Sequence, residues 1–157
     1  MIRISFACCL LAAAAVGVSS CSSSSSSVPV APTAEAQSIL AKTDWLKSKT
    51  IDVMLSSYAF TPQDFTLEKG QPYKLRLINT SGATHTFSSD DLFSAVAVEK
   101  VDRAGVETVG ITKDGVSLEP DEQAEIYLVP LTPGTYRIYC EKFLHETMGM
   151  HGTVTIQ

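Results

Sequence analysis

A short segment near the C-terminus concentrates side chains that bind soft metal ions. Residues 139–152 read YCEKFLHETMGMHG. The potential ligands in it are Cys140, His145, Met148, Met150 and His151. A thiolate is a soft ligand, an imidazole is intermediate, and a thioether is soft and weak. One cysteine, two histidines and a weak axial methionine form the trigonal set of a copper site that transfers electrons. The segment therefore predicts a copper centre if a second histidine lies nearby.

Outside this segment the chain contains one further histidine, His85, in the sequence NTSGATHTF. It follows the expected strand 73–79, and adjacent strand ends of a β-sandwich can bring such positions together. A structural zinc site fits less well, because it usually has four strong ligands with several cysteines. A binuclear copper centre would need a second cysteine in the segment. Taken singly, Cys140 fits a small buried apolar residue, so the metal interpretation depends on the combination.

The N-terminus has the pattern of an export signal. Residues 1–20 have one early positive charge, an apolar run and then small residues. The sequence VSSC, which ends at Cys21, resembles a bacterial lipobox, in which the cysteine is lipidated. The alternative is an ordinary signal peptide with a chance cysteine at its end. Residues 21–37 contain a serine run followed by prolines and alanines, so we expect a flexible tether. These features predict a lipoprotein of the bacterial cell envelope, with its domain in the periplasm or otherwise outside the cytoplasm.

The cysteine count and the charge restrict the function further. Cys8 and Cys9 fall in the expected signal and Cys21 takes the lipid, so Cys140 has no disulfide partner in an exported protein. The formal net charge is −5, which argues against nucleic acid as a partner. No catalytic triad is found, and no carboxylate pair has a supporting context. We therefore expect a protein that is not an enzyme.

Most of the remaining chain has the period-two alternation of β-strands. The runs are 51–60, 64–70, 73–79, 124–129, 135–140 and 152–156. Prolines and glycines separate them, which predicts an all-β sandwich or barrel over residues 38–157. The segment 95–101 looks like another strand, and 102–115 looks like a hairpin or an excursion. A short helix is expected at the N-terminal side, with Thr33 as its cap. Its apolar face comprises Ala36, Ile39, Leu40, Thr43 and Leu46.

From about Ile51 to Gln157 the chain resembles the cupredoxins, the family of plastocyanin, azurin and rusticyanin. YAFTPQDFTLEKGQPYKLRLIN is similar to the family's opening strands, PGTYRIYC to the strand entering the copper loop, and GMHGTVTI to the strand leaving it. The spacing Cys-x4-His-x4-Met is similar to longer-loop members such as rusticyanin. The resemblance implies a Greek-key β-sandwich that binds one copper and carries one electron between Cu(II) and Cu(I). By position, the resemblance implies that His85, Cys140 and His145 are the equatorial ligands and that Met150 is the axial ligand.

The resemblance also implies how the site meets other proteins. In the family the loop histidine lies near an apolar surface, which Phe143, Leu144 and Met148 would form here. We expect this surface to dock a redox partner such as a cytochrome or a copper oxidase or reductase. Phe143 and Leu144 stand where the family often has Pro-Gly. Thr86 stands where many members have an asparagine that ties the ligand loops together, and we expect its hydroxyl to do part of that work.

A second hypothesis is a periplasmic copper carrier or copper-resistance protein. HETMGMH, residues 145–151, contains two histidines and two methionines, a soft cluster suited to Cu(I). Under this hypothesis Met148 and His151 would matter as much as Met150. A metal-free interaction module is a weaker third possibility.

Overall fold

The computed structural model describes residues 33–112 and 114–157. The expected signal peptide, Cys21 and residues 22–32 of the expected tether lie outside the described residues. Within the described ranges, no helix is long and apolar enough to cross a membrane.

The N-terminal helix is shorter than the apolar pattern predicted. Helix α1 (Ala34–Leu40) begins within the range assigned to the tether, because the Thr33 hydroxyl caps it by accepting a hydrogen bond from Ala36 N–H at 3.2 Å. Leu46 was expected on its buried face, and that expectation is wrong. The helix ends at Leu40, and Asp44 starts a separate 3-10 turn, η1 (Trp45–Lys47), by accepting the N–H of Leu46. In this turn Leu46 is 97% exposed.

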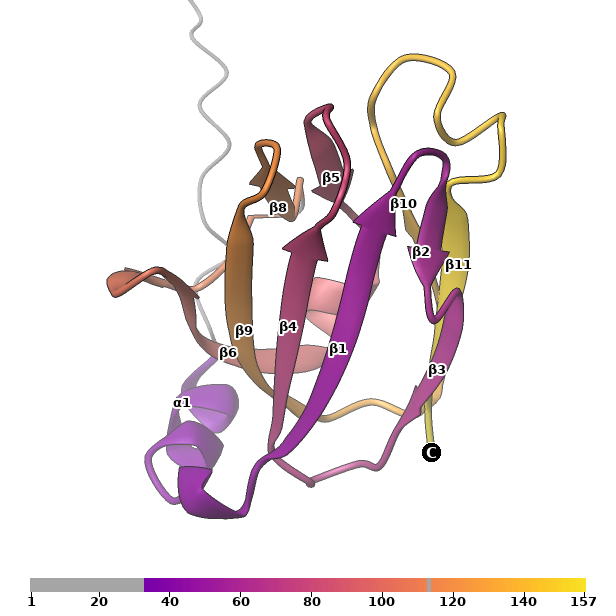
Figure 1. Ribbon diagram of the computed structural model, residues 1–157. Helices are drawn as coiled ribbons and strands as arrows, with labels where there is room; N and C mark the ends of the chain where they lie inside the picture. Colours follow the sequence, from indigo (N-terminus) through magenta and orange to yellow (C-terminus); the bar gives the residue numbers. More distant parts are fainter. Residues whose placement is uncertain (1–32, 113) are drawn as a thin grey trace, which may run out of the picture.

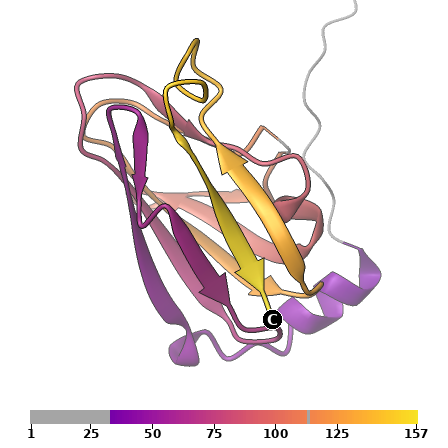
Figure 2. The ribbon, with the colours of Figure 1, turned by 90° about the vertical axis from the view of Figure 1, so that its right-hand side faces the viewer.

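Eleven strands in the described residues form a sandwich, which confirms the predicted all-β class (Figure 1). The larger sheet has the order β2 (Ala59–Thr61), β1 (Lys49–Ser56), β4 (Tyr73–Asn79), β9 (Gln123–Pro130), β6 (Val96–Arg103) and β7 (Val106–Val109). The facing sheet has the order β10 (Gly134–Tyr139), β11 (His151–Ile156) and β3 (Asp64–Leu67), and it lies toward the viewer in Figure 2. A third pair joins β5 (His85–Phe87) to β8 (Val116–Leu118).

The period-two pattern of the sequence corresponds to burial between these layers. In β4 every second residue from Tyr73 to Asn79 is buried, and β9 alternates in the same way from Ala124 to Leu128. One face of each strand thus supplies the core while the other carries charged side chains, as in a sheet with one solvated face. The segment 102–115 begins with the expected hairpin, because β6 and β7 pair across the turn Ala104-Gly105.

The fold brings three parts of the chain to one end of the sandwich. β5 lies beside the end of β10, because the backbones of Ser88 and Tyr139 exchange hydrogen bonds of 3.0 and 2.9 Å. β10 enters and β11 leaves the loop at residues 141–150, which we call the ligand loop; it stands at the top right of Figure 1. Gly152 in β11 has to be glycine, since a Cβ there would lie 1.9 Å from the carbonyl oxygen of Gln63.

Candidate metal centre

Three of the predicted site residues place their donor atoms together. The Nδ1 atoms of His85 and His145 are 3.2 Å apart, and the Cys140 sulfur lies 3.9 Å from the first and 3.6 Å from the second. His85 comes from β5, Cys140 follows β10, and His145 lies in the ligand loop. His85 and Cys140 are buried and His145 is half-buried. Residues far apart in the sequence therefore form one compact donor cluster.

The cluster has the dimensions of a metal site. A point equidistant from three atoms with these separations lies about 2 Å from each, close to the length of a metal–imidazole bond. Two imidazole nitrogens and a sulfur have lone pairs that repel one another unless a proton or a cation lies between them. A thiolate with two imidazoles is also the donor set that suits copper. The residues present therefore fit a bound copper ion.

The electrostatics of His85 are compatible with ligation. Burial, together with the nearby His145 and Lys142, lowers the pKa of His85 below its ordinary value. A metal binds the neutral imidazole, so a lowered pKa keeps the ligand form available at neutral pH. Among the described residues, His85 Nε2 is a buried polar atom without a hydrogen-bond partner. The hydrogen-bond contacts of this ring therefore lie at Nδ1, toward Cys140 and His145.

Met150 lies directly beside the cluster in the backbone network. Its N–H donates to the carbonyl of His145 at 2.9 Å, and its own carbonyl accepts the N–H of Cys140 at 3.1 Å. The residue is fully buried. Met148 is 56% exposed on the outside of the ligand loop, and His151 is half-buried in β11 opposite Tyr139. These positions give the copper-carrier hypothesis no observation in its favour.

Thr86 ties the two ligand-bearing segments together. Its backbone N–H points to the sulfur of Cys140 at 3.4 Å. Its hydroxyl accepts a hydrogen bond of 2.7 Å from the N–H of Glu141, the residue after Cys140. The Thr86 hydroxyl therefore links the two ligand-bearing segments, as expected. An N–H aimed at the sulfur is a hydrogen bond of the kind that tunes a metal–thiolate bond.

The ligand loop is held by its own backbone and covered by apolar side chains. The N–H of His145 donates to Lys142 O, and that of Met148 donates to Leu144 O, at 3.0 and 2.9 Å. Leu144 has a φ of 64°, in the left-handed region where glycine is favoured. Phe143 is 88% exposed and Leu144 is 51% exposed. Met148 is 56% exposed, so three exposed apolar side chains flank His145 along the loop.

One contact of the site was not predicted. The ring of Tyr58, in the turn between β1 and β2, meets the ring of His145 edge-on with 5.0 Å between centroids. Nothing in the sequence indicates a role for this tyrosine at the site. Tyr58 lies near the end of the alternating run 51–60, and this position does not show which loop its side chain contacts.

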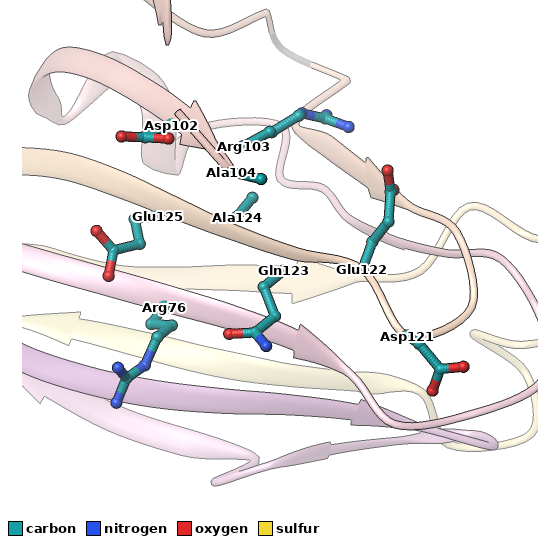
Figure 3. Close-up of a pocket in the computed structure, with 9 residues that line it drawn as sticks. All are labelled: Arg76, Asp102, Arg103, Ala104, Asp121, Glu122, Gln123, Ala124 and Glu125. Carbon is teal, nitrogen blue, oxygen red and sulfur yellow. The ribbon is translucent and has the colours of Figure 1, made fainter. Parts of the chain in front are cut away.

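A second concave region lies on the charged outer face of the larger sheet. A hollow of about 620 Å³ is lined by Arg76 on β4, the end of β6, and residues 121–125. Figure 3 shows its carboxylates spread along the hollow rather than converging on one point. Arg76 pairs with Asp52 at 2.9 and 2.8 Å, and Arg103 donates to Ser117 O at 2.9 Å. We interpret this region as a solvated, internally paired surface.

Comparison with known proteins agrees with this geometry. The family model described as a cupredoxin-like domain matches residues 11–156. The major chloroplast plastocyanin of Arabidopsis thaliana is 34% identical over 140 residues, which cover 81% of this chain and 70% of that protein. Plastocyanin of Capsella bursa-pastoris is 32% identical over 113 residues, covering 68% of this chain and 99% of that protein.

A solved structure also matches the fold. Dithionite-reduced auracyanin from Roseiflexus castenholzii superposes with a TM-score of 0.50 over 70% of this chain and 98% of its own. At 22% identity this likeness supports the architecture alone. The extent of the family match and the identity to plastocyanins carry the assignment. The chain therefore belongs to the cupredoxins, the family of type 1 blue copper electron carriers.

Proposed function

We propose that this cupredoxin binds its single copper through His85, Cys140 and His145 as equatorial ligands, with Met150 as a weak axial ligand. The observation that supports this set is the convergence of two Nδ1 atoms and one sulfur, with separations of 3.2 to 3.9 Å. Met150 is the methionine that is buried and bonded through its backbone to both Cys140 and His145. When bound, copper supplies a one-electron couple between Cu(II) and Cu(I).

The chain's own residues supply a frame that changes little between the two oxidation states. The isolated bridge between Ser88 and Tyr139 holds the segment of His85 beside that of Cys140, and the Thr86–Glu141 hydrogen bond links the same two segments. A donor set held at nearly constant geometry requires little rearrangement when the charge at the site changes. The N–H of Thr86 stabilises negative charge on the sulfur. These features favour fast electron exchange over catalytic turnover.

The apolar surface formed by Phe143, Leu144 and Met148 is the proposed docking site for a redox partner. These exposed side chains flank His145 in the loop, and the His145 ring is the half-buried member of the donor cluster. Transient electron-transfer contacts are small, and an apolar patch with few charged anchors permits rapid release. A cytochrome or a copper oxidase or reductase is the proposed class of partner.

We propose that the chain is anchored in the bacterial cell envelope through a lipid on Cys21. The support is the sequence VSSC after an apolar run, followed by a serine-rich segment. The replacement Cys21→Ala is expected to release the protein from the membrane fraction or to leave it unprocessed. Fractionation followed by mass measurement of the N-terminus tests this. A mature, membrane-bound Cys21→Ala protein would contradict the anchor.

The ligand set is tested by adding Cu(II) to the purified chain and recording its visible spectrum. Equimolar copper is expected to give an intense band, because a thiolate donates charge to Cu(II). The variant Cys140→Ser is expected to lose that band, since a hydroxyl does not replace the thiolate. Zn(II) serves as the control, because its filled d shell gives no such band in either protein. An intense band that persists in Cys140→Ser would remove Cys140 from the ligand set.

A further inference from the structure

Tyr58 has an unfavourable backbone conformation beside the metal centre. It is the second residue of the two-residue turn between β1 and β2, because Ser56 pairs with Ala59. Its φ is 64°, in the left-handed region that a turn of this kind normally fills with glycine or asparagine. Strained residues of this kind cluster at functional sites, where the surrounding structure maintains them. A bulky tyrosine at this position therefore calls for a reason in its side chain.

The side chain and the backbone of Tyr58 both contact the ligand loop. The phenol ring and the His145 imidazole have centroids 5.0 Å apart, with 75° between their planes. At the other end of the loop, a Cβ built on Gly149 would lie 3.7 Å from the carbonyl oxygen of Tyr58, which is ordinary van der Waals contact. The tip of the β1–β2 hairpin thus lies against both His145 and the residue just before Met150.

His145 needs such support more than His85 does. His85 is a strand residue paired with Leu118, whereas His145 belongs to a loop of consecutive turns. The hydrogen-bond contacts of the His145 ring run from Nδ1 to Cys140 and His85. They locate one atom of the ring but not the tilt of its plane. Packing sets that tilt, with Tyr58 on one side and the His85 ring, also 5.0 Å away, on another.

We propose that Tyr58 is a positioning residue that holds the His145 imidazole in its metal-binding orientation. Ligating histidines are normally oriented by a partner outside the metal's own ligands, most often through a hydrogen bond. Here an edge-on aromatic contact performs that role, and the unfavourable turn is retained because it aims the ring. The inference rests on the proposed role of His145 as a copper ligand.

The test compares Tyr58→Gly with Tyr58→Phe and with the control Ala104→Gly. Ala104 also has a positive φ, 50°, in the exposed β6–β7 turn. Both glycine variants relieve an unfavourable turn, but only Tyr58→Gly removes the ring from His145. In the metal-free chain, NMR of the His145 ring is expected to show shifted and broadened signals in Tyr58→Gly alone. In the copper-loaded chain, the same variant is expected to lose up to about tenfold in Cu(II) affinity and to shift the reduction potential.

Tyr58→Phe keeps the edge-on ring and is expected to retain the parent's ring signals and potential. Parent-like His145 signals in Tyr58→Gly would overturn the proposal, as would equal changes in Ala104→Gly. Should Tyr58→Gly fail to fold, Tyr58→Asn replaces it, because asparagine tolerates the left-handed region. An error in the ligand set would appear instead as a copper spectrum that His145→Ala leaves unchanged. The metal-free measurement reports on Tyr58 independently of that outcome.

Discussion

The two histidines of the metal centre are held by different kinds of structure. His85 is 1% exposed and begins a strand whose three residues are all buried. His145 is half-buried, lies in a loop, and has the exposed Phe143 and Leu144 directly before it. The sandwich itself fixes the first ring, whereas turns and a neighbouring hairpin fix the second. One side of the site is thus built to hold a metal in place, and the other to bring it near the surface.

This contrast explains how one small domain keeps the geometry of its metal site constant and still lets a redox partner approach the site. A buried ligand on a strand keeps its position because moving it would disturb the core. A ligand on a loop can contact a partner through its outer edge while its inner nitrogen remains in the site. We therefore expect mutations on the His85 side to lower mainly the stability of the fold, and mutations on the His145 side to alter mainly electron exchange.

The largest effect is expected for alanine at the two histidines. His85→Ala should lower the free energy of unfolding of the metal-free chain by about 2 kcal/mol, because it leaves a cavity in the interior. His145→Ala should lower it by less than about 1 kcal/mol, since the side chain is near the surface. Both should abolish the type 1 spectrum. Urea unfolding measures the free energy of unfolding of each variant. Equal decreases in the two variants would contradict the distinction between the two sides of the site.

The next effect concerns the hydrogen bond that joins the two sides. Thr86→Val removes the acceptor for Glu141 N–H but keeps the backbone N–H that points to the sulfur. Losing this hydrogen bond is expected to cost about 1 kcal/mol of stability. Thr84→Val is the matched control, because the Thr84 hydroxyl bonds to Glu119 in an exposed contact. Thermal unfolding of both variants tests this, and a cost in Thr84→Val as large as in Thr86→Val would argue against it.

A smaller effect on stability, with a clear effect on redox behaviour, is expected at the methionines. Met150→Leu conserves volume and should cost less than about 1.5 kcal/mol. It should shift the reduction potential while one equivalent of copper stays bound, because an axial thioether is a weak ligand. Met148→Leu should change the potential much less, since Met148 lies on the surface. Voltammetry of both variants measures the two potentials. A large shift in Met148→Leu alone would indicate that Met148, and not Met150, is the axial ligand.

The smallest equilibrium effect is expected on the apolar surface. Phe143→Ser should leave the unfolding free energy within about 0.5 kcal/mol of the parent, because the side chain is exposed. Its visible spectrum should also match the parent's, while electron exchange with a cytochrome slows. Val106→Ser on β7 is the control, because Val106 is an exposed apolar residue on an edge strand. An unchanged exchange rate in Phe143→Ser would place docking elsewhere.

The sequence predicted those features that depend on local periodicity and on residue type. The strands followed from alternation, since β4 and β9 each bury one face. The grouping of His85 with Cys140 and His145 followed from donor chemistry and from the position of His85 after a strand. Their roles as ligands, and that of Met150, remain predictions. The lipid on Cys21 also remains one, because it lies outside the described residues.

Other features depended on how distant segments meet, and the sequence held no signal for them. Helical periodicity continued formally to Leu46, but the Asp44 cap redirected the chain and exposed that side chain. The contact of Tyr58 with His145 depends on where a hairpin tip meets a loop. The left-handed φ of Tyr58 and Leu144 was equally hidden, because neither residue is glycine or asparagine, the usual signs of this conformation.

Helix α1 has a mechanical consequence for a chain held at its N-terminus. Its buried side chains, Ala36 and Leu40, pack with Ala97 and Val129 in a small cluster separate from the main core. The helix lies at the opposite end of the sandwich from the ligand loop (Figure 1). A pulling force applied through Thr33 would load the contact of the helix with Ala97 of β6 and Val129 of β9 before it reached β1. If the proposed anchor on Cys21 holds the chain, the helix would then detach at low force and lengthen the link to the membrane, while the metal-binding end stayed folded.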